Sequence, residues 1–139
     1  MAYWLVKSEP GTWSWDQQVQ KGAKGDAWTG VRNHQAKAHL KAMKPGDKAF
    51  FYHSGDEKAV VGIVEVTRAA YPDPTDKTGA FVCVDVKALA PLKTPAPLAA
   101  IKANPALKDM VLVKNSRLSV QPVTAAEWKT VCAMGGVKA

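Results

Sequence analysis

The sequence lacks the features that mark several common protein classes. It has only two cysteines, Cys83 and Cys132, with no C-x-x-C pair and no histidine at metal-ligand spacing. This small count suits a reducing compartment and makes a zinc site unexpected. No apolar run approaches the roughly 20 residues that span a bilayer, and residues 1–7 have no signal-peptide pattern. We therefore expect a soluble, cytoplasmic protein with no membrane partner.

Motifs of common enzymes are also missing. The chain has no G-x-x-x-x-G-K-[ST], G-x-G-x-x-G, G-x-S-x-G or H-E-x-x-H sequence. It therefore lacks the usual motifs of nucleotide-binding proteins and hydrolases. His34 and His39 are five residues apart, a spacing that does not align two helical side chains on one metal. We expect no metal and no cofactor.

The composition that is present is that of a globular domain with excess positive charge. The 139 residues are 47% hydrophobic and 22% charged, which predicts one folded domain over residues 1–139. Nineteen Lys and Arg face twelve Asp and Glu, a formal charge of +7. That excess favours a polyanionic partner, although solubility alone explains it equally well.

Strands and short helices are predicted to alternate irregularly along the chain. Alternation and turn residues predict strands at 3–7, 49–53, 60–66, 81–89 and 117–123. Helices are predicted after the Ser14–Gln17 capping box, after Asn33, at 98–104, and from Thr124 to about 132. Residues 25–30 and 71–76 are predicted loops, and Pro91, Pro95 and Pro97 predict an extended connector. The mixture indicates an α+β fold: a small mixed sheet or barrel with helices on its rim.

The helix after Asn33 presents two faces. Ala36, Leu40 and Met43 recur at the spacing of one apolar face. A lysine row, defined as Lys37, Lys41 and Lys44, follows the same spacing on a neighbouring face. The row is either a solvated surface or a phosphate-contacting stripe.

Aromatic or basic side chains stand beside short polar ones at three predicted element ends, 7–10, 28–33 and 51–54. An aromatic plane with a few polar groups is what one nucleobase requires, for stacking and for edge hydrogen bonds. From the pattern alone, Trp28 is either a buried anchor of its loop or part of such a binding surface.

Five blocks in this chain resemble the signature blocks of the EVE domain family, a group within the PUA-like superfamily. They are Tyr3–Pro10, Trp28–Asn33, Phe51–Ser54, Tyr71–Asp73 and Arg117–Pro122, in the expected order. The resemblance implies a PUA-like curved sheet or barrel with short peripheral helices, and a more distant relationship to YTH domains. Lys7-Ser8 is similar to the Lys-Ser that ends the first YTH strand, Trp28 to a tryptophan of the YTH methyladenine cage, and Ser54 to the polar end of the corresponding YTH strand.

The resemblance implies a non-catalytic reader that holds a modified base of DNA or RNA in an aromatic pocket, and we expect a monomer. Trp28 would stack on an extruded base, opposed by Tyr52 or Trp13. The base-binding residues implied are Ser8, Trp13, Trp28, Asn33, Tyr52 and Ser54. Those implied at phosphates or the pocket entrance are Lys7, Arg32, His53, Arg117 and Ser119. A purely bracing role for Arg117 and Ser119 in the last strand remains open.

Two other functions compete with the reader. The related ASCH group includes small amidohydrolases that act on modified cytidine. Lys7 and Glu9 could serve such an enzyme as base and acid, with Ser8 or Thr29 activating water. The third hypothesis is a protein-interaction module with a vestigial pocket.

Overall fold

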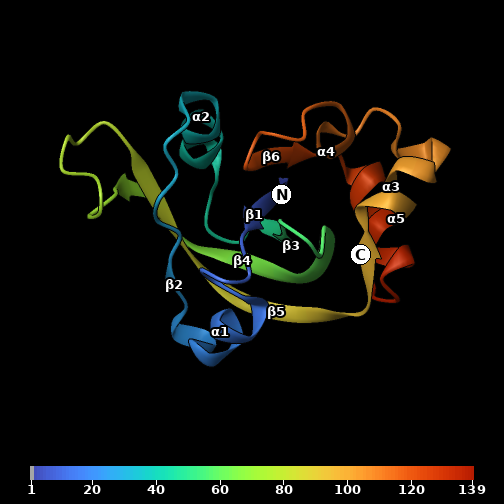
Figure 1. Ribbon diagram of the computed structural model, residues 1–139. Coiled ribbons are helices and arrows are strands. Elements are labelled where there is room, and N and C mark those ends of the chain that lie inside the picture. The colour runs from blue at the N-terminus through green and yellow to red at the C-terminus, as the bar shows by residue number, and fades with distance from the viewer. Residues whose placement is uncertain (1) are drawn as a thin grey trace.

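The computed structural model describes residues 2–139, which form one open sheet surrounded by short helices (Figure 1). The elements, in chain order, are β1 (Tyr3–Ser8), α1 (Trp15–Gln20), η1 (Gly22–Lys24), β2 (Asp26–Ala27), α2 (His34–Ala42), β3 (Lys48–His53), β4 (Ala59–Pro72), β5 (Val82–Pro97), α3 (Leu98–Ala103), η2 (Pro105–Leu107), α4 (Val111–Lys114), β6 (Val120–Val123) and α5 (Ala125–Met134). The predicted α+β class is confirmed.

The six strands lie in the order β2-β5-β4-β3-β1-β6. Only β1 and β3 run parallel, and the other neighbouring pairs are antiparallel. The register of β4 against β5 shifts at four places, and such irregularities bend a strand pair. The result is the PUA-like curved sheet that was predicted, but it does not close into a barrel.

Alternation along β1 and β3 divides the core into two clusters, one on each face of the sheet. Trp4 and Phe51 belong to a cluster that includes α2 residues, whereas Leu5 and Phe50 belong to one that includes α3, α4 and α5 residues. Because successive strand residues point to opposite faces, this division assigns a face to every later residue of both strands. In Figure 1, α3 and α5 lie at the opposite end of the sheet from α2.

The predicted helix starts are confirmed in detail. Ser14 and Thr124 both form complete capping boxes, and the Asn33 side chain accepts the Ala36 N–H at 2.9 Å. Ala36 and Leu40 of the predicted apolar face of α2 are buried, and so is Met43, which follows the end of the helix in extended backbone. Such caps satisfy backbone N–H groups that the first helical turn leaves without partners.

Strands β4 and β5 are both longer than predicted. The expected connector with Pro91, Pro95 and Pro97 is part of β5, and Tyr71 and Pro72 end β4 rather than lying in a loop. Within residues 2–139, β5 pairs with β2 at Asp85 and Val86, and elsewhere β4 is its only strand neighbour. An edge strand tolerates proline because one row of its N–H groups has no ladder partner.

Two smaller predictions need correction. The predicted strand at 117–123 is regular only over β6, because β6 pairs with β1 only as far as Val6. The predicted loop 25–30 contains β2, whose Asp26 and Ala27 pair with β5. Helix α4 was not predicted. Among residues 2–139, no helix has the length and apolar character needed to cross a membrane.

Candidate functional site

A cleft of about 380 Å³ opens where β1 ends, beside the segment that joins β2 to α2. Its walls combine two tryptophans, four hydroxyl side chains, two cations and one carboxylate. We call it the first cleft; its lining residues are Lys7, Ser8, Glu9, Thr12, Trp13, Ala27, Trp28, Thr29, Gly30, Val31, Arg32 and Ser119. The volume is within the range of small-molecule sites.

Trp28 both lines this cleft and anchors its segment. Its side chain is 7% exposed and its ring stands perpendicular to that of Phe51, with 5.4 Å between centroids. Its backbone N–H donates to the Val84 carbonyl at 2.7 Å, which continues the β2–β5 pairing. The two interpretations that the sequence left open for Trp28 therefore do not exclude each other.

Trp13 forms the more accessible aromatic wall and is held from two directions. Its indole N–H donates to Oε1 of buried Gln18 at 2.9 Å, and Gln18 donates in turn to the Val86 carbonyl at 3.2 Å. The hydroxyl of Ser8 donates to the Trp13 carbonyl. Because these contacts fix the indole before any ligand arrives, binding against it requires little ordering.

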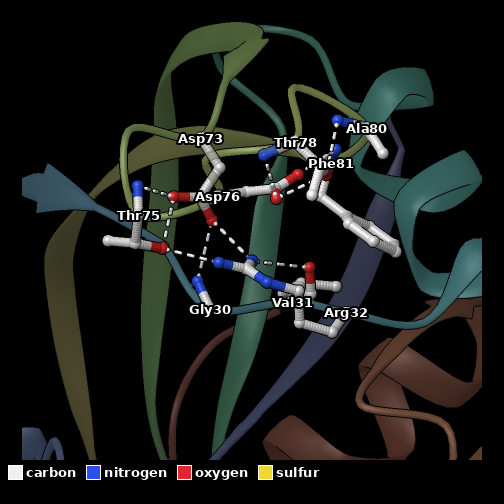
Figure 2. Close-up of polar contacts among 9 residues, drawn as sticks. All are labelled: Gly30, Val31, Arg32, Asp73, Thr75, Asp76, Thr78, Ala80 and Phe81. Atoms are coloured by element: carbon white, nitrogen blue, oxygen red, sulfur yellow. Dashed lines mark hydrogen bonds and ion pairs between the residues drawn. The ribbon is translucent and has the colours of Figure 1, made fainter.

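The β4–β5 loop holds two further residues of the cleft lining, Gly30 and Arg32 (Figure 2). A carboxylate oxygen of buried Asp73 accepts the Gly30 N–H at 2.9 Å and an Arg32 guanidinium N–H at 3.1 Å, while Arg32 also donates to the Thr75 hydroxyl at 2.8 Å. Burial would raise the pKa of Asp73, but hydrogen bonds from Thr75, Gly30 and Arg32 outweigh it and lower the pKa. We call this arrangement the Asp73 clamp.

The loop that carries Asp73 is itself ordered by Asp76. The Asp76 carboxylate accepts the Thr78 hydroxyl at 2.7 Å and the Phe81 N–H at 2.8 Å (Figure 2). The hydrogen bond from Thr78 is the main cause that lowers the pKa of Asp76 to about 2. Phe81 then lies 5.7 Å from the Arg32 guanidinium, between ring centroid and Cζ.

A second cleft of about 510 Å³ adjoins the first and shares Lys7 and Ser119 with it. The lining residues of this second cleft are Lys7, Tyr52, Ser54, Gly55, Lys58, Leu98, Lys102, Leu112, Ser116, Arg117 and Ser119. The Lys7 ammonium donates to the Ser116 carbonyl and lies 5.5 Å from the centroid of the Tyr52 ring. Burial lowers the pKa of Lys7 and raises that of Tyr52.

Comparison with known proteins identifies the family. The family model described as "EVE domain" matches residues 2–134. This chain belongs to the EVE domain family.

Solved structures of similar proteins extend over the whole EVE domain. Rpa0253 from Rhodopseudomonas palustris is 70% identical, with a TM-score of 0.93 over 98% of this chain and 94% of that one. The human THYN1 protein, in complex with DNA containing 5-methylcytosine, is 32% identical, with a TM-score of 0.89 and full coverage of both chains. A YTH domain from Zygosaccharomyces rouxii, in complex with N6-methyladenosine RNA, is 19% identical with a TM-score of 0.59 over 96% of this chain and 86% of that one, a likeness of fold alone.

The EVE domain brings together six of the residues predicted for the site. Ser8, Trp13, Trp28, Lys7, Arg32 and Ser119 line the first cleft. Tyr52, Ser54 and Arg117 line only the second. Tyr52 is separated from Trp28 because it belongs to the core cluster on the opposite face of the sheet.

Two predicted residues line neither cleft. Asn33 is exposed, and its side chain caps α2. The two ring nitrogens of His53 are both engaged: Nε2 accepts the Trp15 N–H at 3.0 Å, and Nδ1 lies 2.7 Å from a Glu57 carboxylate oxygen. Within this structure His53 fixes the start of α1 rather than facing a ligand.

Sequence reasoning did not assign Asp73, Lys58 or Lys102 to a site. The Asp73-Pro74-Thr75 turn carried a signal for Asp73, since an aspartate often accepts hydrogen bonds two residues ahead. Thr75 indeed donates both its N–H and its hydroxyl to Asp73. Lys58 and Lys102 line the same cleft only because the folded chain brings them together. No local sequence pattern indicates either residue.

Residues 2–139 contain no group of three His, Cys, Asp or Glu side chains arranged to hold a metal ion. Cys83 and Cys132 are both free and buried.

Proposed function

We propose that this EVE domain reads modified bases in DNA by holding one extruded base in the first cleft. The observation that carries the proposal is a cleft with two fixed tryptophans and a polar rim, in a family whose human member forms a complex with DNA containing 5-methylcytosine.

The lining of the first cleft separates into parts suited to base, edge and phosphate. Trp28 and Trp13 offer aromatic surface, and base–aromatic stacking contributes about 1–3 kcal/mol per base. The hydroxyls of Ser8, Thr12 and Thr29 can donate or accept at the base edge. Lys7 and Arg32 stand at the sides of the same cleft, where the phosphates of an extruded nucleotide pass.

The direct test is a titration with short DNA strands that carry one 5-methylcytosine or one cytosine at the same position. We expect tighter binding of the methylated strand. Trp13→Ala should weaken that binding about 5- to 150-fold, the equivalent of 1–3 kcal/mol. Tyr3→Ala is the matched control, because Tyr3 is another half-buried aromatic but stacks on Trp128 in the other core cluster.

Equal affinity for both strands, together with no loss in Trp13→Ala, would contradict the proposal. The same sequences as RNA test the choice of DNA. Repeating the titration with other modified bases tests which modification the cleft prefers.

The amidohydrolase hypothesis retains one supporting feature. Lys7, whose pKa burial lowers, lines the first cleft together with Glu9. However, the Lys7 ammonium donates to the Ser116 carbonyl on the side of the second cleft. Mass spectrometry of modified nucleosides after incubation distinguishes the two functions, and we expect the nucleosides to be unchanged.

A further inference from the structure

The second cleft is lined by four cations and by no carboxylate. Lys7, Lys58, Lys102 and Arg117 line it, and no ion pair within residues 2–139 joins any of them to an acidic side chain. Glu9 lines the first cleft, and its carboxylate also lies next to Gly55 of the second, but it forms no ion pair with any of the four cations. Four cations without acidic partners in one concavity concentrate a positive potential that attracts anions.

The four cations come from four separate segments of the chain. One of these residues, Lys58, has an unfavourable backbone conformation. Lys58 has φ +49°, the only positive φ at a non-glycine among residues 2–139. Left-handed backbone is uncommon for a lysine, and a glycine would adopt it without strain. The Lys58 carbonyl also accepts the Leu98 N–H at 2.8 Å, which joins this turn to α3, the helix of Lys102.

The two clefts are contiguous through the end of β1. Lys7 and Ser119 line both, and the Lys7 N–H donates to the Ser119 carbonyl at 2.9 Å. Ser8, the next residue, lines only the first cleft. If the base of an extruded nucleotide fills the first cleft, its backbone can therefore reach the second cleft past Lys7 and Ser119, which line both.

We propose that the second cleft binds the phosphodiester backbone of the nucleotides next to the extruded base. The inference rests on the proposed function of the first cleft and extends it to a second, sequence-independent subsite. Polyanionic backbone suits this surface better than an apolar anchor, because Leu112 and Tyr52 are buried and Leu98 is half-buried. Phosphate contacts supply affinity and position a nucleic acid, whereas base contacts specify it.

The test removes two exposed cations of the second cleft in the double variant Lys102→Gln/Arg117→Gln. The matched control, Lys108→Gln/Lys129→Gln, removes the same charge from exposed lysines that line neither cleft. The probes are two single-stranded DNA oligonucleotides with one 5-methylcytosine or one cytosine at the same position, titrated from about 0.05 to 0.5 M salt, and the free nucleoside 5-methyldeoxycytidine, which carries no phosphate.

We expect the double variant to reduce the slope of log K against log salt by about 1.4, or 0.7 per lost contact. That change corresponds to about 25-fold weaker oligonucleotide binding at 0.1 M salt. Nucleoside affinity should not change. Lys58→Gly should lower the slope by about 0.7 without loss of stability, because it removes a charge while relieving the positive φ.

Equal slopes for the double variant and its control would overturn the inference. Loss of oligonucleotide affinity in the double variant, with no preference for the methylated base in any protein, would keep the second cleft and reject the proposed role of the first. A wild type that binds neither probe would reject both.

Discussion

The first and second clefts share a wall but are built in opposite ways. In the first, fixed groups dominate: Trp13 is held by Gln18, Trp28 by Phe51 and Val84, and Arg32 by the Asp73 clamp. In the second, the charges of Lys58, Lys102 and Arg117 are on exposed residues. A cleft of fixed groups favours selection by shape, and one lined by exposed cations favours binding by charge. The comparison predicts that specificity and affinity can be changed separately by mutating one cleft or the other.

The largest expected effect comes from Trp28→Ala, which attacks the fixed cleft at its core. Removing this buried indole should lower the free energy of unfolding by about 3–5 kcal/mol, measured by urea denaturation. Trp128→Ala should have a stability cost in the same range, since Trp128 is buried in the other cluster.

Binding separates these two tryptophans. At a temperature where both variants are folded, Trp28→Ala should lose preference for the methylated strand and Trp128→Ala should keep it. The conservative Trp28→Phe tests the same point if the alanine variant does not fold. Preference retained in both Trp28 variants would make Trp28 only an anchor.

Gly25→Ala should displace the Trp28 segment from the side of β5. A Cβ there would lie 2.3 Å from the Val86 carbonyl oxygen, at φ +68°. We expect about 1–2 kcal/mol of destabilisation from the left-handed backbone, and about 1–3 kcal/mol more from the overlap. Gly22→Ala, at φ +60° with open space around it, isolates the backbone contribution; similar losses in thermal unfolding would argue against the overlap.

Six of the residues predicted for the site line the first cleft together, and five of them belong to the recognisable sequence blocks. Sequence reasoning did not predict which face of the sheet each residue of β3 occupies. Phe51 and Tyr52 are adjacent in one strand, so they could not both face Trp28, and the structure assigns them to different clusters. His53 is on the correct face, but tertiary contacts with Trp15 and Glu57 use its nitrogens, which no local pattern reveals.

Predictions of the fold were also correct where local sequence decides and wrong where distant contacts decide. Capping boxes at Ser14 and Thr124 are local hydrogen-bond patterns and were predicted correctly. The length of β5 was not, because Pro91, Pro95 and Pro97 read locally as breakers. Their place in a strand depends on β5 having β4 as its only partner there, and strand order is a property of the whole sheet.

Asp73→Asn should loosen the fixed cleft by an intermediate amount, about 1–3 kcal/mol at neutral pH, because it weakens hydrogen bonds to a charged acceptor. The folded-state pKa of Asp73 lies below its ordinary value. Its contribution is therefore present above about pH 4 and is lost as the pH falls through the lowered pKa. Urea midpoints of wild type and variant should converge in acid.

Asp56→Asn, in the exposed turn before β4, controls for the loss of a carboxylate. A difference between wild type and Asp73→Asn that stays constant from pH 7 down to about pH 2 would show that the Asp73 charge does not carry the clamp. Binding of the methylated strand should weaken in parallel with stability, because Gly30 and Arg32 line the first cleft.

The smallest effect is expected from the lysine row, which lines neither cleft; Lys37 and Lys41 lie in α2, and Lys44 follows the end of that helix. Lys41 and Lys44 are exposed, and Lys37 lies 5.8 Å from the Phe81 ring centroid, measured from its ammonium. If nucleic acid contacts only the two clefts, Lys41→Gln should leave the salt slope of oligonucleotide binding unchanged. A fall of about 0.7 would mean that the strand continues past Arg32 along α2. The row would then be a phosphate-contacting stripe, and the binding surface would have a third part.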